Sequence, residues 1–311
     1  MNSINKNKSV IVQTPATVAN LVCGFDVLGM CLYEPFDEMQ LTLLDEPIVI
    51  IKSENGFDLP ADPTKNTAGA PLLRIIEEQN ATYGFEVIIK KNIKPGSGIG
   101  SSAASAAGAV VAANHLLGNV FSKVEMVRLA MYGEAVASGV QHADNIAPCI
   151  YGGITLIRSN HPLDIVTISS PFIFVTVVHP QIEVRTADAR KVLPTEVPLK
   201  DAIKQWGNVG GLIAGFLKND LQLVSRSLED CIVEPARKKL IPGLDEVKLK
   251  SKMVGALGGG ISGSGPSIFM LSETEAIARK VEVEMKQIYT DLKIDFHTYV
   301  TTINPDGVRV M

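Results

Sequence analysis

Glycine and serine alternate just ahead of an alanine-rich run within residues 93–118, IKPGSGIGSSAASAAGAVVAANHLLG. Gly96, Gly98 and Gly100 leave the backbone bare, and Ser101–Ser102 would open a helix. The first amides of a helix have no partners within it and lie at the positive end of its dipole, so they attract phosphate. The stretch therefore predicts a phosphate-binding loop, with a tight turn made for packing as the alternative.

Two widespread nucleotide motifs are missing from this loop. A dinucleotide-binding fingerprint needs G-x-G-x-x-G with an acidic residue about 20 positions later, and a Walker A loop needs G-K-[ST] at the helix start. Neither pattern is present. A phosphate site here would depend on backbone amides, beside a helix that its alanines keep thin enough for another backbone to approach.

Two further segments carry groups suited to the same chemistry. Glu134 lies in a predicted helix, MYGEAVASG, where its carboxylate could ligate Mg²⁺, although a single helical Glu is also typical of a solvated surface. Between Gly255 and Leu271, glycine and serine again precede an apolar strand. This second segment is consistent either with a loop that covers a ligand bound to another domain or with a plain hairpin.

Composition limits the class of protein. The chain has 311 residues, of which 46% are hydrophobic and 20% charged, and this favours two soluble globular domains. Its net charge of −4 argues against a nucleic-acid surface, and no run approaches the roughly 18 apolar residues of a membrane span. We therefore expect a cytoplasmic protein without nucleic-acid or membrane partners. Four widely spaced cysteines predict buried thiols rather than zinc ligands or disulfides: Cys23, Cys31, Cys149 and Cys231.

Hydrophobic periodicity predicts strands that alternate with helices, which is typical of an α+β fold. The predicted strands are 9–13, 39–43, 85–91, 154–157, 165–168, 172–179, 267–271 and 296–302. The predicted helices are 66–79, the alanine-rich run, 124–138, 199–218, 221–230 and 273–291. The pattern restarts beyond Pro171, so we place a boundary near residue 165 and expect domains over residues 1–165 and 166–311.

Three segments together resemble the motifs of the GHMP small-molecule kinases, and the resemblance covers nearly the whole chain. They are TPATVANLVCGFDVLGMCL over residues 14–32, PGSGIGSSAAS over 95–105 and GISGSGPSIF over 260–269. The second is close to the family's P-x-x-x-G-[LI]-G-S-S-A-[AS] phosphate loop. Within the family, the chain resembles the members that phosphorylate homoserine at QHADNIAP, RTADARKVLP, EPARKKLIPG and the ending INPDGVRVM.

The resemblance implies a two-domain fold. Its N-terminal ATP-binding domain would be like domain 2 of ribosomal protein S5, and its C-terminal domain, a ferredoxin-like α/β sandwich, would complete the substrate site. It also implies transfer of the γ-phosphoryl group of ATP to the hydroxyl of L-homoserine with Mg²⁺, in threonine biosynthesis, by a homodimer. Two alternatives stay open: a GHMP kinase for another small alcohol such as mevalonate or shikimate, and a catalytically inactive metabolite-binding protein.

The matching motif positions imply roles for single residues at the nucleotide. Ser102 and Glu134 would hold Mg²⁺. Thr67 and the stretch leading into Lys90 and Lys91 would border the nucleotide. The residues implied to bind ATP itself are Pro95, Gly96, Ser97, Gly98, Ile99, Gly100, Ser101, Ser102, Ala103 and Asn66.

Homoserine is a small zwitterion, so its site needs partners for a carboxylate and for an ammonium group. By the resemblance, Arg190 and Arg237 would clamp the carboxylate, a task that suits the planar fork of arginine. Asp26 would accept from the ammonium, with Asn20 beside it, and His142 would line the pocket without transferring a proton. The full implied substrate-binding set is Asn20, Asp26, His142, Asn145, Thr186, Arg190 and Arg237.

The hydroxyl of the substrate has no evident protein base. Asn145 lies eleven residues after Glu134, at the interval where mevalonate-type relatives look to have a carboxylate, and an amide cannot take a proton at neutral pH. We therefore predict catalysis by positioning and charge stabilisation, in which the proton passes to the phosphate. Asp144 stays a weaker alternative base, since successive side chains usually point apart. The predicted catalytic residues are Asn145, Glu134 and Ser102.

Overall fold

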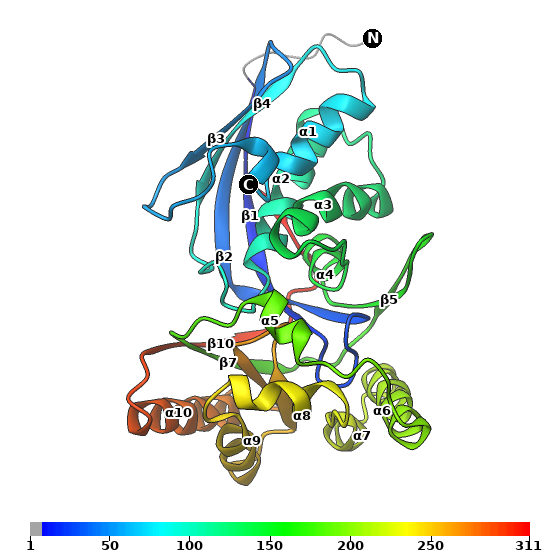
Figure 1. The fold of residues 1–311 in the computed structure, drawn as a ribbon, viewed down its shortest axis with the longest axis vertical. Coiled ribbons are helices and arrows are strands. Elements are labelled where there is room, and N and C mark those ends of the chain that lie inside the picture. Colours follow the sequence, from blue (N-terminus) through cyan, green and yellow to red (C-terminus); the bar gives the residue numbers. More distant parts are fainter. Residues whose placement is uncertain (1–7) are drawn as a thin grey trace.

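A computed structural model describes residues 8–311, and in it two sheets lie one above the other, each with its own helices (Figure 1). The first sheet contains β1 (Ser9–Ala19), β2 (Leu28–Leu44), β3 (Val49–Ser53), β4 (Gly84–Lys90), β5 (Ile154–Asn160), β6 (Leu163–Ile168) and β11 (Arg309–Val310). Its order is β11-β1-β2-β4-β3, and β5 pairs with both β2 and β6. Only β3 and β4 pair in parallel among these described strands.

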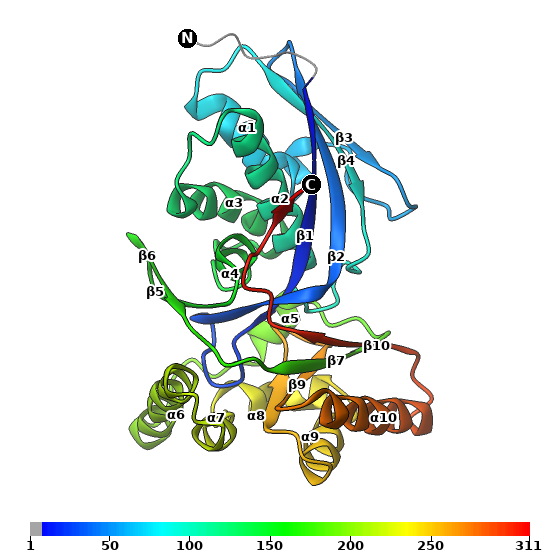
Figure 2. The ribbon, with the colours of Figure 1, turned by 180° about the vertical axis from the view of Figure 1, so that it is seen from behind.

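Four helices cover one face of this sheet, as Figures 1 and 2 show from opposite sides. They are α1 (Gly69–Glu78), α2 (Ser101–Leu116), α3 (Lys123–Ser138) and α4 (Ile146–Tyr151). From Pro35 to Leu44, β2 alternates buried and more exposed residues, the period expected when only one face is covered. The predicted helix over 66–79 forms as α1, in which Leu72 and Ile75 are buried.

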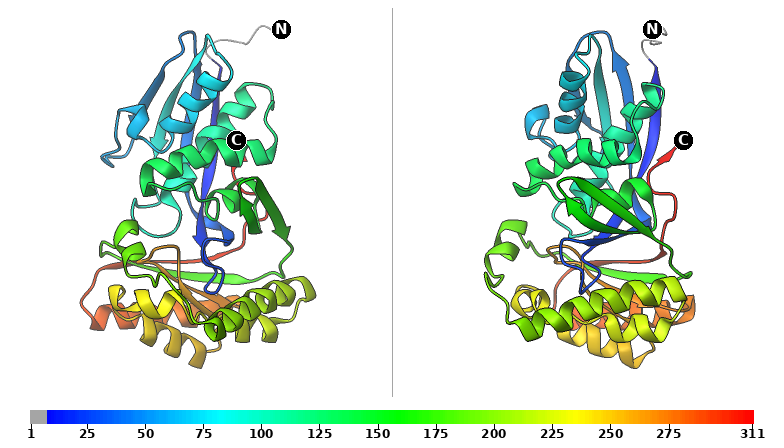
Figure 3. Two further views of the ribbon diagram at one scale, coloured as in Figure 1. Left: turned by 45° about the vertical axis from the view of Figure 1, so that its right-hand side comes forward. Right: turned by 90° about the vertical axis from the view of Figure 1, so that its right-hand side faces the viewer.

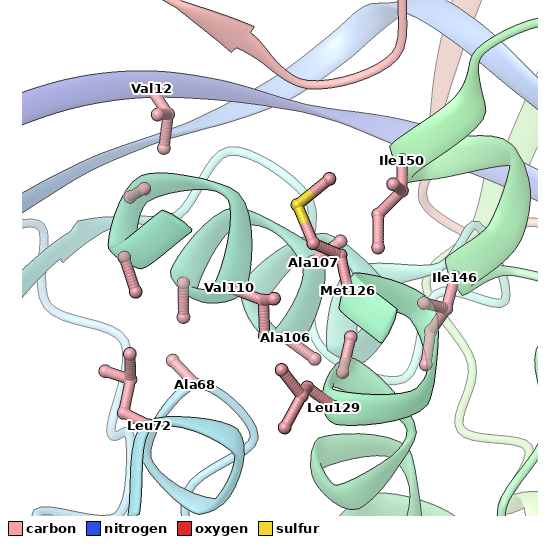
Figure 4. Packing of buried hydrophobic residues seen from close by; sticks show 14 of the residues in the cluster. Val12, Ala68, Leu72, Ala106, Ala107, Val110, Met126, Leu129, Ile146 and Ile150 are labelled. Carbon is pink, nitrogen blue, oxygen red and sulfur yellow. The ribbon is translucent and has the colours of Figure 1, made fainter. Parts of the chain in front are cut away.

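Alanine lets α2 lie at the centre of the first layer. Figure 4 shows its small side chains between the sheet and the other three helices. Two glycines allow close packing here: a Cβ on Gly108 of α2 would lie 2.2 Å from Thr14 Cγ2, and one on Gly133 of α3 would lie 2.1 Å from the carbonyl oxygen of Thr67. The thin helix predicted from the alanine run therefore serves packing along its length and leaves its N-terminus at the edge of the layer.

The second layer is a four-stranded antiparallel sheet of order β10-β7-β9-β8 with helices beneath it (Figure 3). Its strands are β7 (Phe174–Pro180), β8 (Gly258–Ile261), β9 (Ile268–Ser272) and β10 (Phe296–Thr302). Its helices are α5 (Thr186–Lys191), α6 (Leu199–Lys218), α7 (Leu221–Ser227), α8 (Val233–Arg237), α9 (Leu244–Met253) and α10 (Glu275–Asp291). Single 3₁₀ turns occur at Pro63–Lys65 and Lys238–Leu240.

The chain passes from the first sheet to the second between Ile168 and Phe174 and later returns. We propose this crossing as the domain boundary, close to the predicted residue 165. β11 then pairs with β1 of the first sheet, with Val310 opposite Val12. Among residues 8–311, none of the helices has both the length and the apolar run that a membrane crossing requires.

The cysteines are free thiols. Cys23, Cys31 and Cys149 are buried, as predicted, whereas Cys231 is partly exposed. Burial raises the pKa of the buried three, to about 12 for Cys23, so they remain protonated thiols at neutral pH.

Candidate active site

A cavity of about 390 Å³ lies between the two layers and takes its walls from both. The first layer contributes the turn 20–26, the glycine loop with the start of α2, the end of α3 and the segment 142–145. The second contributes Arg237, the turn between β8 and β9, and α5, which lies between the layers in Figure 1. Residues that are distant in the sequence therefore meet at one site.

The glycine loop turns into α2 through left-handed backbone. Gly96, Gly98 and Gly100 have φ values of 75°, 83° and 72°, a region that glycine enters at little cost. The first amide of the helix with a carbonyl partner is that of Ala104, which donates to Gly100 at 2.8 Å. The amides of residues 101–103 precede it, so the 16-residue helix presents free donors at its positive end.

The turn between β8 and β9 holds this loop in place. Ser262 Oγ donates to the carbonyl of Gly98 at 2.7 Å, and Ser267 Oγ donates to the carbonyl of Ser97 at 2.6 Å. β8 and β9 form an antiparallel hairpin, and its turn also lines the cavity through Gly263. The segment 255–271 is therefore a hairpin whose turn reaches the other layer, and that it covers a ligand stays a prediction.

A buried ion pair anchors the other side of the loop. Lys91 Nζ pairs with the fully buried Asp37 and donates to the carbonyl of Ser101 at 3.0 Å. Asp37 also accepts from the amides of Asn92 and Ile93, at 2.7 and 2.8 Å. Lys91 lines the cavity, but its charge is already paired. We therefore infer that Lys91 supports the glycine loop rather than contacting the nucleotide with its charge.

Two of the residues predicted at the nucleotide, Lys90 and Asn66, have side chains that face other neighbours. Lys90 is exposed, pairs with Glu38 at 3.1 Å and does not line the cavity. The side chain of Asn66 lines it but is used locally: its Oδ1 accepts from the amide of Ala68 at 2.9 Å and its Nδ2 donates to Pro60 at 2.8 Å. Thr67 lines the cavity.

Ser97, Ile99 and Ala103 are buried and do not line the cavity. Ser97 and Ile99 instead offer carbonyls to the hairpin turn and to the amide of Thr17. Only their backbone is left for a ligand, because the alternation of the loop directs their side chains inward. Pro95, Gly96, Gly98, Gly100, Ser101 and Ser102 do line the cavity.

Ser102 and Glu134 meet at the start of α2. Ser102 Oγ donates to Glu134 Oε2 at 2.8 Å, and burial raises the pKa of Glu134. Residues 8–311 contain no group of three or more His, Cys, Asp or Glu side chains that could hold a metal alone. Mg²⁺ commonly takes one or two protein oxygens and fills its other positions with phosphate and water, so this carboxylate and hydroxyl fit it in the presence of a nucleotide.

Asp26 and Arg190, which both line the cavity, form an ion pair. Arg190 Nη2 lies 3.0 and 3.1 Å from the two carboxylate oxygens of Asp26 and 2.7 Å from His142 Nε2. Because the guanidinium donates, His142 Nε2 must accept, which fixes the neutral tautomer of the ring. Burial lowers the pKa of His142, in keeping with that neutral state.

Arg237 is buried against the same cluster. Its Nε donates to the carbonyl of Ala189 and its Nη1 to that of Gly263, both at 2.9 Å. Burial, aided by the charge of Arg190, lowers the pKa of Arg237 to about 10, so it stays charged at neutral pH. The ring of Phe25 lies 5.0 Å from the Arg237 Cζ and 5.6 Å from that of Arg190, close enough for cation–π attraction to both.

Asn20 and Thr186 complete the polar wall. Asn20 Nδ2 donates to the carbonyl of Gly263 at 2.9 Å, and its Oδ1 accepts from the amide of Asp26 at 3.0 Å. Thr186 Oγ1 lies 3.4 Å from Ser264 Oγ. All seven residues of the predicted substrate-binding set line the cavity.

Asp144 and Asn145 both line the cavity although they are successive residues. Burial, with the charges of Asp26 and Glu134, raises the pKa of Asp144 to about 7. Asn145 Oδ1 accepts from Thr17 Oγ1 at 2.8 Å. The chain here begins α4 rather than running as a strand, and both residues reach the cavity.

Several lining residues were not singled out from the sequence: Phe25, Asp58, Leu59, Pro60, Lys65, Ile89, Ser105, Val136, Ala137 and Ser138. Phe25 lies inside a quoted motif, directly before Asp26, and an aromatic residue next to a charged one was the available signal. The stretch from Asp58 to Lys65 shows only turn-forming residues, which carry no sign of a ligand.

Comparison with known proteins agrees with this architecture. The family model for the GHMP kinases N terminal domain matches residues 66–153, and that for the GHMP kinases C terminal region matches residues 212–291. A crystal structure of homoserine kinase from Cytophaga hutchinsonii is 48% identical, with a TM-score of 0.93 over 97% of each chain. A structure of L. major mevalonate kinase in complex with R-mevalonate has a TM-score of 0.73 at 16% identity, a likeness of fold alone.

Curated relatives extend the match over the full length. A protein of Chlorobium phaeobacteroides named homoserine kinase is 47% identical over 95% of this chain and 97% of its own. One of Methanococcus maripaludis with the same name is 39% identical over 96% of this chain and 97% of its own. With both halves of the fold and nearly all of the sequence matched, the chain belongs to the homoserine kinases of the GHMP kinase family.

Proposed function

We propose that this protein transfers the γ-phosphoryl group of ATP to the side-chain hydroxyl of L-homoserine, giving O-phospho-L-homoserine and ADP. The observation that carries the proposal is that one cavity is lined both by the N-terminus of α2 and by a pair of opposite charges. Ser102, Asp26 and Arg190 all line it. Its volume of about 390 Å³ is in the range of pockets for small ligands.

The phosphates of ATP would lie on the amides at the start of α2, since these donors are free and stand at the positive end of the helix. Ser102 and Glu134 would hold Mg²⁺, which supplies positive charge for the phosphoryl oxygens when it is bound. Asp58, Lys65 and Thr67 also line the cavity and would border the adenine ring of ATP.

Homoserine would replace the ion pair of Asp26 and Arg190 by two new pairs. Its ammonium group takes Asp26, and its carboxylate takes Arg190 together with Arg237, whose Nη2 has no protein acceptor among the described residues. A zwitterion supplies an opposite charge for each residue of the opened ion pair. A neutral alcohol or a simple carboxylate leaves at least one charge without a partner, so the site favours an amino acid.

In the reaction, the hydroxyl oxygen attacks the γ-phosphorus while the bond from phosphorus to the ADP oxygen breaks. The electron pair of that bond stays on ADP, and the hydroxyl proton passes to a γ-phosphoryl oxygen. A loose transition state tolerates this, because little bond formation to the nucleophile is needed at the barrier. The amides of α2 and the side chain of Asn145 would stabilise the developing charge.

Product analysis tests the proposal directly. The protein is incubated with ATP, MgCl₂ and L-homoserine, and phosphorus NMR with mass spectrometry looks for a new phosphomonoester and ADP. Chelation of the metal with EDTA should stop the reaction. Product from mevalonate or shikimate but not homoserine would favour the alternative kinase, and homoserine binding by calorimetry without ADP formation would favour an inactive binding protein.

Location and assembly are part of the same proposal. A cytoplasmic enzyme fits the use of ATP and the free thiols of the chain. A homodimer is supported by α6, which exposes four large apolar side chains: Leu199, Ile203, Trp206 and Leu217. Light scattering over a dilution series tests the assembly, and a constant monomer mass would reject it.

A further inference from the structure

We propose that Thr17 is a positioning residue, whose hydroxyl turns the side-chain amide of Asn145 so that its N–H groups, and not its oxygen, face the transferred phosphoryl group. The inference rests on the proposed kinase reaction. Thr17 Oγ1 donates to Asn145 Oδ1 at 2.8 Å. Asn145 lines the cavity, whereas Thr17 is fully buried and does not, so Thr17 would act only through its neighbour.

The backbone of β1 directs the side chain of Thr17 toward Asn145. The register of β1 against β2 shifts between Pro15 and Thr17, and such a bulge redirects the side chain that follows it. The amide of Thr17 donates to the carbonyl of Ile99 in the glycine loop at 3.1 Å. A Cβ on Gly100 would lie 2.0 Å from Thr17 Oγ1, so the loop has glycine where the hydroxyl must fit.

Asn145 is free for this contact because it does not cap its helix. It occupies the N-cap of α4, where an asparagine side chain commonly accepts from a helix amide, yet it makes no such hydrogen bond. An amide side chain has an oxygen that accepts and a nitrogen that donates. With the oxygen held by Thr17, the donating nitrogen is the end left for the cavity.

This orientation decides what Asn145 can do. N–H donors directed at a phosphoryl oxygen stabilise the negative charge that develops there, whereas an amide oxygen in the same place would repel it. The donors cannot accept the hydroxyl proton, which is consistent with its transfer to the phosphoryl group. Loss of the Thr17 hydroxyl would let the amide rotate and present either end.

The test compares Thr17→Val, which keeps the volume but removes the hydroxyl, with Thr17→Ser, which keeps the hydroxyl. We expect Thr17→Val to lower kcat about 10- to 100-fold, less than the loss of a charge-stabilising donor outright. KM for homoserine and for ATP should stay unchanged, since Thr17 touches neither. Thr17→Ser should restore most of kcat. Folding is followed by thermal unfolding, and if Thr17→Val does not fold, Thr17→Cys takes its place as a weak donor of similar size.

A double-mutant cycle with Asn145→Ala separates positioning from a structural role. If Thr17 acts through Asn145, Thr17→Val should cause no further loss of kcat once Asn145 is alanine. An equal loss in both backgrounds, or a rise in KM at constant kcat, would overturn the inference. The unmodified protein is assayed first with homoserine: no turnover rejects the proposed function, whereas an additive cycle in an active enzyme rejects the role of Thr17 alone.

Discussion

The ion pair between Asp26 and Arg190 has to open before an amino acid can take the place of both partners. We predict that Asp26→Asn and Arg190→Gln each raise KM for homoserine about 10- to 100-fold, since a hydrogen bond to a charged group contributes about 1.5–3 kcal/mol. KM for ATP should change little, because neither residue belongs to the set implied to bind ATP. Steady-state kinetics with each substrate varied in turn measures both.

Arg185→Gln is the matched control for this pair. Arg185 is an exposed arginine just before α5, pairs with Glu183 at 2.9 Å and does not line the cavity. Its replacement should leave KM for homoserine unchanged. An effect as large as that of Arg190→Gln would mean that the net charge of the α5 region, rather than the pair with Asp26, governs binding.

Asp144 links the stability of the fold to pH. Burial and then the charges of Asp26 and Glu134 raise its pKa to about 7 from an ordinary value of 3.8, so the native state holds a proton that the unfolded chain releases. The contribution of Asp144 to the free energy of unfolding therefore falls as pH rises from about 4 to about 7. We predict that Asp144→Asn gains in free energy of unfolding relative to the unmodified protein on going from pH 4 to pH 8. The difference between the two proteins should be about 2–4 kcal/mol larger at pH 8. Urea unfolding at both values measures this, and a pH-independent difference would contradict it.

Residues whose type and order carry the chemistry were open to prediction. The glycine loop suggested a phosphate site because a helix N-terminus follows it, and the family motifs singled out Ser102 and Glu134, which both line the cavity. Thr17 could not be found, since it is one polar residue of a strand and its partner lies 128 positions away. The supporting role of Lys91 was hidden for the same reason: Asp37, its counter-ion, lies 54 positions earlier.

The contact between the glycine loop and the hairpin turn of β8 and β9 can be tested with two glycines that share a backbone conformation. Gly96 and Gly98 both have positive φ, so alanine at either costs about 1 kcal/mol in backbone strain. A Cβ on Gly98 would also lie 2.5 Å from the carbonyl oxygen of Gly265, whereas one on Gly96 meets open space. We predict that Gly98→Ala is clearly less stable than Gly96→Ala and loses more activity.

Chemical unfolding of both variants provides the measurement. Gly98→Ala pushes the glycine loop away from the hairpin turn of β8 and β9, whereas Gly96→Ala leaves that contact intact. Equal losses of stability would show that the close approach of Gly265 has no cost, and the interlocking of loop and hairpin would then need another explanation.

Among the elements, those with a clear hydrophobic period were predicted, including the short strands β5, β6 and β9, whereas the glycine-built β8 was not. The predicted helix 199–218 forms as α6, and the strand 296–302 forms as β10. β8 has the sequence GGGI and no side-chain pattern, yet a Cβ on Gly259 would lie 1.9 Å from the carbonyl of Phe269, so close pairing demands glycine there. β2 runs 17 residues, although only 39–43 were predicted, because its first part is buried by both layers and does not alternate.

At the scale of the molecule, the two layers share one hydrophobic cluster. Val18 and Leu28 of the first sheet belong to the same buried cluster as Val175, Leu212 and Phe269 of the second layer. We predict a single cooperative thermal transition in which the calorimetric and van't Hoff enthalpies agree, because unfolding of either layer would expose the cluster that both share. Two resolved transitions in scanning calorimetry would show that the layers unfold independently.

The return of the chain to the first sheet has a consequence for biosynthesis. β11 pairs with β1, and the amide of Met311 donates to the carbonyl of Ile11 at 2.9 Å. On the ribosome, this edge of β1 stays unpaired until Arg309 and Val310 have left the exit tunnel. A nascent chain stalled before Arg309 therefore lacks the closing strand.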